Sequence, residues 1–276
     1  MYTTLMVHLE LDADHRPLLT IASDLAERFD ADVIGIVACQ LVRVVVGHGV
    51  VPVQAFESDR DEIEAQMGRA EQAFRAALAK RADRLHWLGL LTAGPPTDAV
   101  VEQMRGADML ITAVDAQASW VGPGRRVGVE DLVMRIGRPA LVVPARAQSL
   151  VPDRILVGWK DTRETRRAVA DALPLLRLAK QVVVVEVVTQ ETRLPAARTH
   201  TEEVCAWLQR HGVAAEAQAF ATGDQYVVSL DAIAEQVGAD MIVAGAYGHS
   251  RMREWALGGV TRDLLKYSRR CSLLSH

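Results

Sequence analysis

The most informative part of the sequence runs from Asp240 to Thr261. It reads Asp240-Met241-Ile242-Val243-Ala244, then directly Gly245-Ala246-Tyr247-Gly248 and, after nine further residues, Gly258-Gly259-Val260-Thr261. The first five residues are typical of a buried strand. Glycine permits positive φ and close backbone approach, so the following loop can turn several N–H groups toward one anion. A helix starting near Gly259 adds unpaired N–H donors. The pattern predicts a phosphate-binding loop; a plain glycine-rich connection is the alternative.

The chain also repeats itself. Gly106–Ala113 recurs as Gly238–Gly245 at an offset of 132 residues, and Leu5–Val7 recurs as Ile155–Val157 at an offset of 150. The difference between the offsets indicates an insertion in the first copy, which we place in 40–68, between its second strand and the next helix.

A length of 276 residues is long for one core and suits two. We expect a first domain over residues 1–146, a linker over 147–153 and a second domain over 154–276.

Each copy alternates strand-like and helix-like segments. The strands are expected at 4–11, 32–38, 84–91, 108–113, 139–144, 154–159, 181–188, 214–220, 240–244 and 271–275. The helices of the second copy are expected at 163–178, 198–211, 225–237 and 259–269. Five strands alternating with four helices predict an α/β fold of two tandem doubly wound five-stranded parallel-sheet domains, related by a pseudo-twofold axis.

The motifs resemble those of the universal stress protein family. Gly-x2-Gly-x9-Gly followed by a small or hydroxyl residue is similar to the family's ATP-binding signature. Arg154–Trp159 with Asp161–Glu164 resembles its first strand and turn, and Cys271–His276 resembles its last strand. The resemblance covers nearly the whole chain as two copies, the first degenerate. It implies an adenine-nucleotide alpha-hydrolase-like fold and a cytoplasmic stress-response regulatory protein that binds ATP, ADP or AMP, with any Mg²⁺ brought by the nucleotide.

The resemblance also implies which residues bind the nucleotide. Adenine contacts fall at the ends of the first two strands of the second copy, and phosphate contacts fall on the glycine loop. The implied residues are Trp159, Lys160, Asp161, Val187 (or its neighbour Val188), Gly245, Gly248, His249, Gly258, Gly259, Val260 and Thr261.

Two departures from the family pattern concern this site. Lys160 stands where ATP-binding members have an acid, and Asp161 follows one position late; a lysine there can instead neutralise a phosphate. Gly259 stands where a serine or threonine is usual, although Thr261 supplies one hydroxyl further on. A missing neutral hydrogen bond is worth about 1 kcal/mol, so its loss should weaken binding several-fold without abolishing it.

The first copy has lost the signature. After Ala113 the chain continues as Val114–Trp120 with no glycine pair in register, and Asp115, Glu10 and Asp12 would place negative charge near any phosphate. We therefore expect this copy to bind no nucleotide and to serve as the partner of the second copy in an intrachain pseudo-dimer. The closing strands 140–144 and 271–275 are expected to pack against each other, because an uncovered apolar edge aggregates. The sequence does not decide whether whole chains also form a homodimer.

No catalytic or metal-binding constellation is evident. His249 and His276 are typical of exposed or hydrogen-bonded residues, and no nucleophile–base pair is visible. We expect a protein that is not an enzyme. Two alternatives remain: a slow ATPase, and a nucleotide-independent interaction protein with a relic loop, which Lys160 and Gly259 favour. The protein partner is unknown in either case.

Composition narrows the class of protein. The formal net charge is −4 and the three cysteines are scattered, as in a cytoplasmic protein with reduced thiols. No apolar run is long enough for a membrane span, and the N-terminus has no signal-peptide pattern. A small basic excess over 245–276 favours an anionic ligand and is too aromatic-poor for nucleic acid. Arg269 and Arg270 are expected on a solvated helix face.

Overall fold

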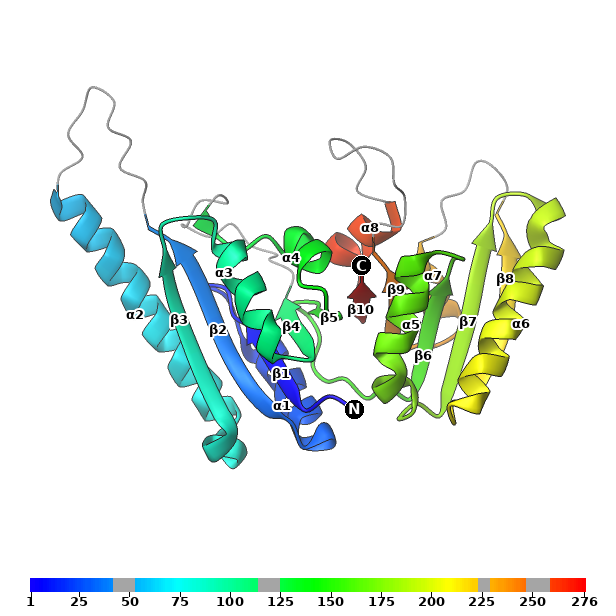
Figure 1. Cartoon of the computed structure of the whole chain (residues 1–276), viewed down its shortest axis with the longest axis horizontal. Coiled ribbons are helices and arrows are strands. Elements are labelled where there is room, and N and C mark those ends of the chain that lie inside the picture. Colours follow the sequence, from blue (N-terminus) through cyan, green and yellow to red (C-terminus); the bar gives the residue numbers. More distant parts are fainter. Residues whose placement is uncertain (42–52, 114–124, 223–228, 247–258) are drawn as a thin grey trace, which may run out of the picture. The chain divides into compact units, whose positions relative to one another are not determined.

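The computed structural model describes residues 1–41, 53–113, 125–222, 229–246 and 259–276. The chain divides into two compact units, Met1–Ile136 and Gly137–His276 (Figure 1). The division places strand 140–143 with the second unit, whereas the repeat pattern ends the first domain at 146. The domain boundaries drawn from the repeats stay a prediction.

The first unit is a doubly wound α/β layer structure. Its sheet has the order β3-β2-β1-β4 with parallel pairing throughout. In chain order its elements are β1 (Thr4–His8), α1 (Arg16–Phe29), β2 (Asp32–Gln40), α2 (Val53–Ala77), η1 (Ala79–Arg84), β3 (Leu85–Thr92), α3 (Pro96–Gln103), η2 (Met104–Gly106), β4 (Met109–Ala113) and α4 (Val129–Arg135).

The second unit has the same winding. Its sheet has the order β5-β10-β9-β6-β7-β8, parallel except for the β5–β10 pair. Its elements are β5 (Ala140–Val143), β6 (Arg154–Trp159), α5 (Arg163–Leu176), β7 (Gln181–Val188), η4 (Glu191–Arg193), α6 (Leu194–Arg210), β8 (Ala215–Ala221), α7 (Leu230–Gln236), β9 (Met241–Gly245), α8 (Gly259–Tyr267) and β10 (Cys271–Ser275). The predicted α/β class and strand succession are confirmed.

The repeated Gly-Ala-Asp sequence has a structural role in both units. Asp108 Oδ2 accepts hydrogen bonds from the N–H groups of Thr3 and Thr4 at 2.7 and 3.0 Å, at the start of β1. Asp240 Oδ2 accepts one from the N–H of Arg154 at 2.9 Å, at the start of β6. Each aspartate thus ties the first residue of one central strand to its neighbour, which explains why the motif recurs.

The core of the second unit follows from its strand sequences. Val182–Val185 is a run of β-branched residues, all buried, as expected for a strand covered on both faces. A right-handed crossover places α5 and α6 on one face of the sheet and α7 and α8 on the other. In the described residues α6 packs on β7 and β8, whereas α7 contacts α8 and β9.

The predicted contact between the closing strands is confirmed. β10 pairs antiparallel with β5, with Ser272 opposite Val142 and Leu274 opposite Ala140. On its other side β10 pairs parallel with β9. All five residues of β10 are buried, so this apolar strand presents no edge to water.

The position predicted for the insertion, ahead of the next helix, is wrong. We placed it before a helix, but α2 begins at Val53 and therefore includes much of 40–68. α2 has 25 residues where its counterpart α6 has 17. Ile63, Met67, Ala70 and Phe74 are buried along one side of α2, and their helical spacing was the signal that should have located it.

Candidate functional site

The candidate site lies where the winding of the second unit changes direction. β6 pairs with β7 on one side and with β9 on the other. From β6 the chain proceeds outward through β7 to β8, and from β9 it proceeds outward in the opposite direction to β10. Crevices at the carboxyl ends of such strands are the usual ligand sites of open α/β sheets. Two of the implied contact residues, Trp159 and Gly245, are the last residues of β6 and β9.

Gly245 is required by close packing between β9 and α5. A Cβ at this position would lie 2.6 Å from the backbone nitrogen of Thr165 and 2.8 Å from the carbonyl carbon of Glu164. Since both atoms are backbone, no side chain can yield. The start of the glycine loop is thereby pressed against the first turn of α5.

That first turn is well capped. Thr162 precedes the helix with extended dihedral angles, and its Oγ1 accepts a hydrogen bond from the N–H of Thr165 at 3.3 Å. Burial alone would raise the pKa of the Glu164 carboxyl, but hydrogen bonds from its own backbone N–H and Thr162, with the charge of Arg163, hold that pKa below its ordinary value. The positive end of the α5 dipole therefore lies at the same sheet edge as Gly245.

Ala246 fixes the point from which the glycine loop leaves the sheet. It is buried, and its N–H donates to the carbonyl oxygen of Ser275 at 2.8 Å. Its own carbonyl oxygen lies 3.1 Å from His276 Nδ1, and the carbonyl oxygen of His276 accepts from Arg167 Nη1 at 2.9 Å. His276, expected to be exposed or hydrogen-bonded, is hydrogen-bonded and helps to hold the loop.

Trp159 carries a donor without an acceptor. In the described part of the chain its indole Nε1 is buried and has no hydrogen-bond partner. A Cβ on the preceding Gly158 would lie 2.5 Å from Leu230 Cδ1, so Gly158 faces α7. Because strand side chains alternate, Trp159 points to the opposite face. Its register partner Glu186 lies on that face too and pairs with His200 at 3.1 Å.

Lys160 and Asp161, where the chain departs from the family pattern at the end of β6, are both at the surface. Asp161 Oδ1 forms an ion pair with Arg166 Nη2 at 2.6 Å, with both side chains more than half exposed. Lys160 is exposed, and its carbonyl oxygen accepts from the N–H of Thr162 at 2.6 Å. Lys160 therefore adds positive charge near the end of β6, whereas Arg163 Nη2 is paired with Glu164 Oε1 at 3.0 Å. Val187 is half-buried and its neighbour Val188 is buried.

The remaining predicted residues belong to the loop and the helix after it. Gly248, His249 and Gly258 lie outside the described residues. Gly259 and Val260 open α8, and Thr261 is buried in its first turn.

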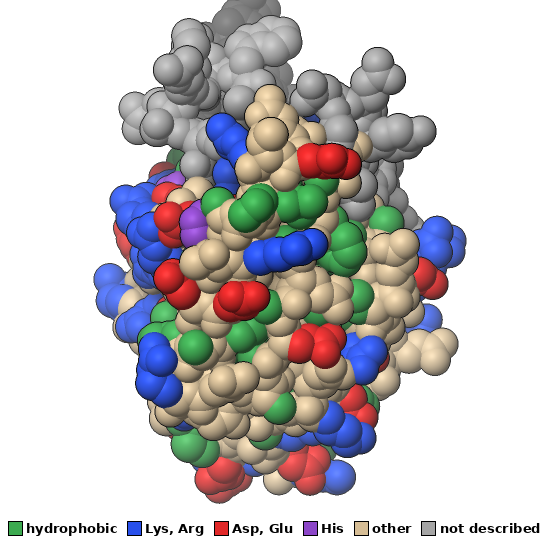
Figure 2. All heavy atoms as spheres, turned by 90° about the vertical axis from the view of Figure 1, so that its right-hand side faces the viewer, with side chains coloured by type: hydrophobic (Ala, Val, Ile, Leu, Met, Phe, Trp, Pro, Cys, Tyr) green, Lys and Arg blue, Asp and Glu red, His purple; other side chains and the backbone are tan. Residues whose placement is uncertain are grey.

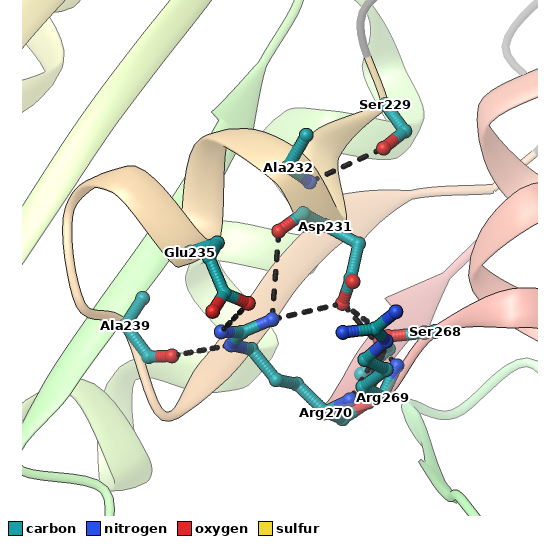
Figure 3. A network of polar contacts seen from close by, with 9 residues as sticks. Ser229, Asp231, Ala232, Glu235, Ala239, Ser268, Arg269 and Arg270 are labelled. Atoms are coloured by element: carbon teal, nitrogen blue, oxygen red, sulfur yellow. Dashed lines mark hydrogen bonds and ion pairs between the residues drawn. The ribbon is translucent and has the colours of Figure 1, made fainter.

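A groove of ≈ 490 Å³ lies between α7 and α8. Arg270 forms ion pairs with two of the lining residues, with Nη1 3.2 Å from Asp231 Oδ1 and Nη2 2.8 Å from Glu235 Oε2, as Figure 3 shows. The prediction that Arg270 lies on a solvated face is wrong, because only 18% of its side chain is exposed. Since Asp231, Glu235 and Asp263 line the groove, its charge does not suit a phosphate.

The equivalent place in the first unit holds a buried histidine. His8, at the end of β1, takes the position that Gly158 has in β6; its Nδ1 lies 3.1 Å from Thr112 Oγ1 and its Nε2 3.9 Å from Glu10 Oε1. Burial, with a smaller contribution from His15, lowers the pKa of His8 to about 4. His8 is not among the residues predicted from the sequence; a histidine ending an apolar strand was the available signal. Asp115 lies outside the described residues.

Three further properties of the described residues concern metal sites, reactive thiols and membrane spans. No three of their histidine, cysteine, aspartate or glutamate side chains are placed to hold a metal ion together. Cys39, Cys205 and Cys271 are buried free thiols, and burial raises the pKa of each. In the same residues no helix has the length and apolar character of a bilayer-spanning segment.

Comparison with known proteins shows similarity at the level of the fold. No family model and no curated protein matches the chain. A universal stress protein from Archaeoglobus fulgidus DSM 4304 is 12% identical and superposes with a TM-score of 0.69, over 98% of this chain and 95% of that one. A putative universal stress protein from Pseudomonas aeruginosa UCBPP-PA14 is 14% identical, with a TM-score of 0.62 over 99% and 93%. Because both likenesses run over almost the entire length of each chain, this chain has the universal stress protein fold that its motifs predicted.

Proposed function

We propose that this chain is a stress-response regulatory protein of the tandem universal stress type that binds one adenine nucleotide, ATP, ADP or AMP, in its second unit. Its fold and the change of winding direction between β6 and β9 support the proposal. The bound nucleotide would change the surface that the second unit presents to a protein partner.

The buried indole N–H of Trp159 is the observation that carries the proposal. A buried donor without an acceptor is rare and costs about 1–3 kcal/mol, unless a ligand supplies the acceptor. An adenine ring nitrogen or a ribose oxygen is such an acceptor. Lys160 would then neutralise phosphate charge, together with the N–H groups of the glycine loop and of the first turn of α8.

Replacement of Trp159 by phenylalanine tests this assignment. Trp159→Phe keeps an aromatic ring and removes the N–H, so we expect ATP, ADP and AMP all to bind several-fold more weakly. Calorimetric titration of each nucleotide measures the effect. Trp207→Phe, on α6 against His211 at 4.3 Å, is the matched control and should bind like the wild type. Equal affinities for wild type and Trp159→Phe would remove the indole from the site.

A second candidate is a nucleotide-independent interaction protein. The ion pair between Asp161 and Arg166 favours it, because this carboxylate is already engaged and not presented to a ribose. Protein purified without added ligand separates the candidates: released nucleotide supports the first, and its absence together with no calorimetric signal supports the second.

We also propose that the chain is not an enzyme. The proposal rests on the sequence, which shows no nucleophile–base pair, so a slow ATPase would need a base that the sequence does not display. Release of labelled phosphate from ATP above the buffer background would contradict it.

A further inference from the structure

The outer edge of β8 has no partner in the described part of the second unit. β8 is the last strand of the order, and its seven residues pair only with β7. Natural edge strands are commonly protected by lysine, proline or a bulge. The sequence of β8, AEAQAFA, contains neither lysine nor proline, and Glu216 is its only charge. Phe220 near its end is 38% exposed. β8 is therefore an edge able to accept another strand.

A groove runs beside this edge. It has a volume of ≈ 300 Å³ and is lined by Arg198, Thr201 and Glu202 of α6 and by Ala217–Phe220 of β8. Ala217 and Ala219 lie on the same face of the strand because side chains alternate, and their methyl groups leave the space beside α6 hollow. Figure 2 looks onto this end of the second unit, where hydrophobic side chains gather with charged ones beside them.

Two charges on the wall of the groove are of opposite sign. Arg198 and Glu202 are four residues apart, one helical turn, so they lie on the same side of α6. Neither forms an ion pair with another described residue. A partner that fits this wall has to offer an acid opposite Arg198 and a base opposite Glu202.

We propose that a second copy of this chain pairs with β8 through its own β8, antiparallel and around a twofold axis at Gln218. Such an interface is self-complementary, since each contact between two positions occurs twice. Glu216 then faces Phe220 of the partner subunit, so the glutamates do not meet. The sheet continues from one copy into the other at the ordinary strand spacing of about 4.8 Å.

The same axis pairs the charges of α6. The groove is lined by Arg198, Thr201 and Glu202 of α6 and by Ala217–Phe220 of β8, so the stretch of α6 between Arg198 and Glu202 lies beside Gln218 and its neighbours. Rotation about an axis at Gln218 therefore brings Arg198 opposite Glu202 of the partner subunit, and Glu202 opposite the partner's Arg198. The two α6 helices lie antiparallel on one face of the joined sheet and fill each other's grooves. This charge match favours a second copy over a foreign strand.

Charge reversal in the full chain tests the interface. Sedimentation equilibrium from about 1 to about 100 μM should show a dimer for the wild type. Arg198→Glu and Glu202→Arg each place like charges together twice, so each should weaken the dimer at least about tenfold. The double variant Arg198→Glu/Glu202→Arg restores both pairs and should restore the dimer. Glu203→Arg, on the same helix but outside the groove lining, is the control and should leave it unchanged.

Three other results of these measurements would each overturn the proposal. A wild type that stays monomeric over the whole range has no such interface, and the groove then belongs to a different partner. A dimer that Arg198→Glu leaves intact forms through another face. A double variant as weak as the single ones shows that the charges do not meet across the axis. None of these measurements depends on nucleotide binding.

Discussion

The protonation of His8 is strongly coupled to folding. The folded protein holds it fully buried against Thr112 with a pKa of about 4, compared with 6.5 for a solvated histidine. Above pH 6.5 it is neutral in both states and the stability is complete. As the pH falls from 6.5 toward 4, the unfolded chain takes up a proton that the folded chain excludes, so the free energy of unfolding decreases. The pKa difference corresponds to about 3 kcal/mol.

Replacing His8 should therefore flatten the pH dependence of stability. His8→Gln keeps a hydrogen-bonding partner for Thr112 and removes the titration. We expect its free energy of unfolding, measured in urea at each pH, to fall by about 3 kcal/mol less than that of the wild type between pH 6.5 and pH 4. His86→Gln, at an exposed position of β3, should behave like the wild type. Parallel curves for His8→Gln and wild type would contradict the buried neutral state.

At the scale of elements, β10 holds two strands together. It pairs with β9 on one side and β5 on the other, and its five residues are all buried. A chain ending after Arg270 would expose the edges of both β5 and β9, and it would lose the carbonyl of Ser275 that binds Ala246. Exposed apolar edges pair with other chains.

We therefore expect the chain truncated after Arg270 to be insoluble or to form large oligomers. Light scattering during chromatography and a thermal melt measure this. Removal of His276 alone keeps all of β10 and is the control, which should elute like the full chain. A truncated protein that has the size and melting behaviour of the full chain would show that β10 does not hold these edges.

The elements differ in how far the sequence predicted them. β6, β7 and β10 were expected at their observed bounds, because apolar runs bounded by turn residues leave little choice. β1 was expected to residue 11 but ends at His8, where the chain turns toward Asp12, a residue with a φ of 61°. α2 was misplaced because its many charges conceal a narrow apolar stripe. The antiparallel β5–β10 pair followed from the need to cover two apolar strands.

For the molecule as a whole, the repeat in the sequence predicted the order of strands and helices well. It predicted the side-chain contacts at the ends of these elements less well. Trp159 and Gly245 end β6 and β9 where the motifs place them, since strand ends follow from the hydrophobic pattern. Other features depend on contacts between distant residues. The buried His8–Thr112 contact, the Asp161–Arg166 pair and the bridge from Arg270, just before β10, to α7 each required the fold to be known.

The chain should hold one nucleotide site, in the second unit. A calorimetric titration of the full chain with ATP counts the sites. We predict a stoichiometry of one nucleotide per chain, and we predict that Gly248→Asp, which puts a carboxylate into the phosphate loop, removes the binding while the protein still melts cooperatively. Two nucleotides per chain, or unchanged affinity in folded Gly248→Asp, would contradict the account.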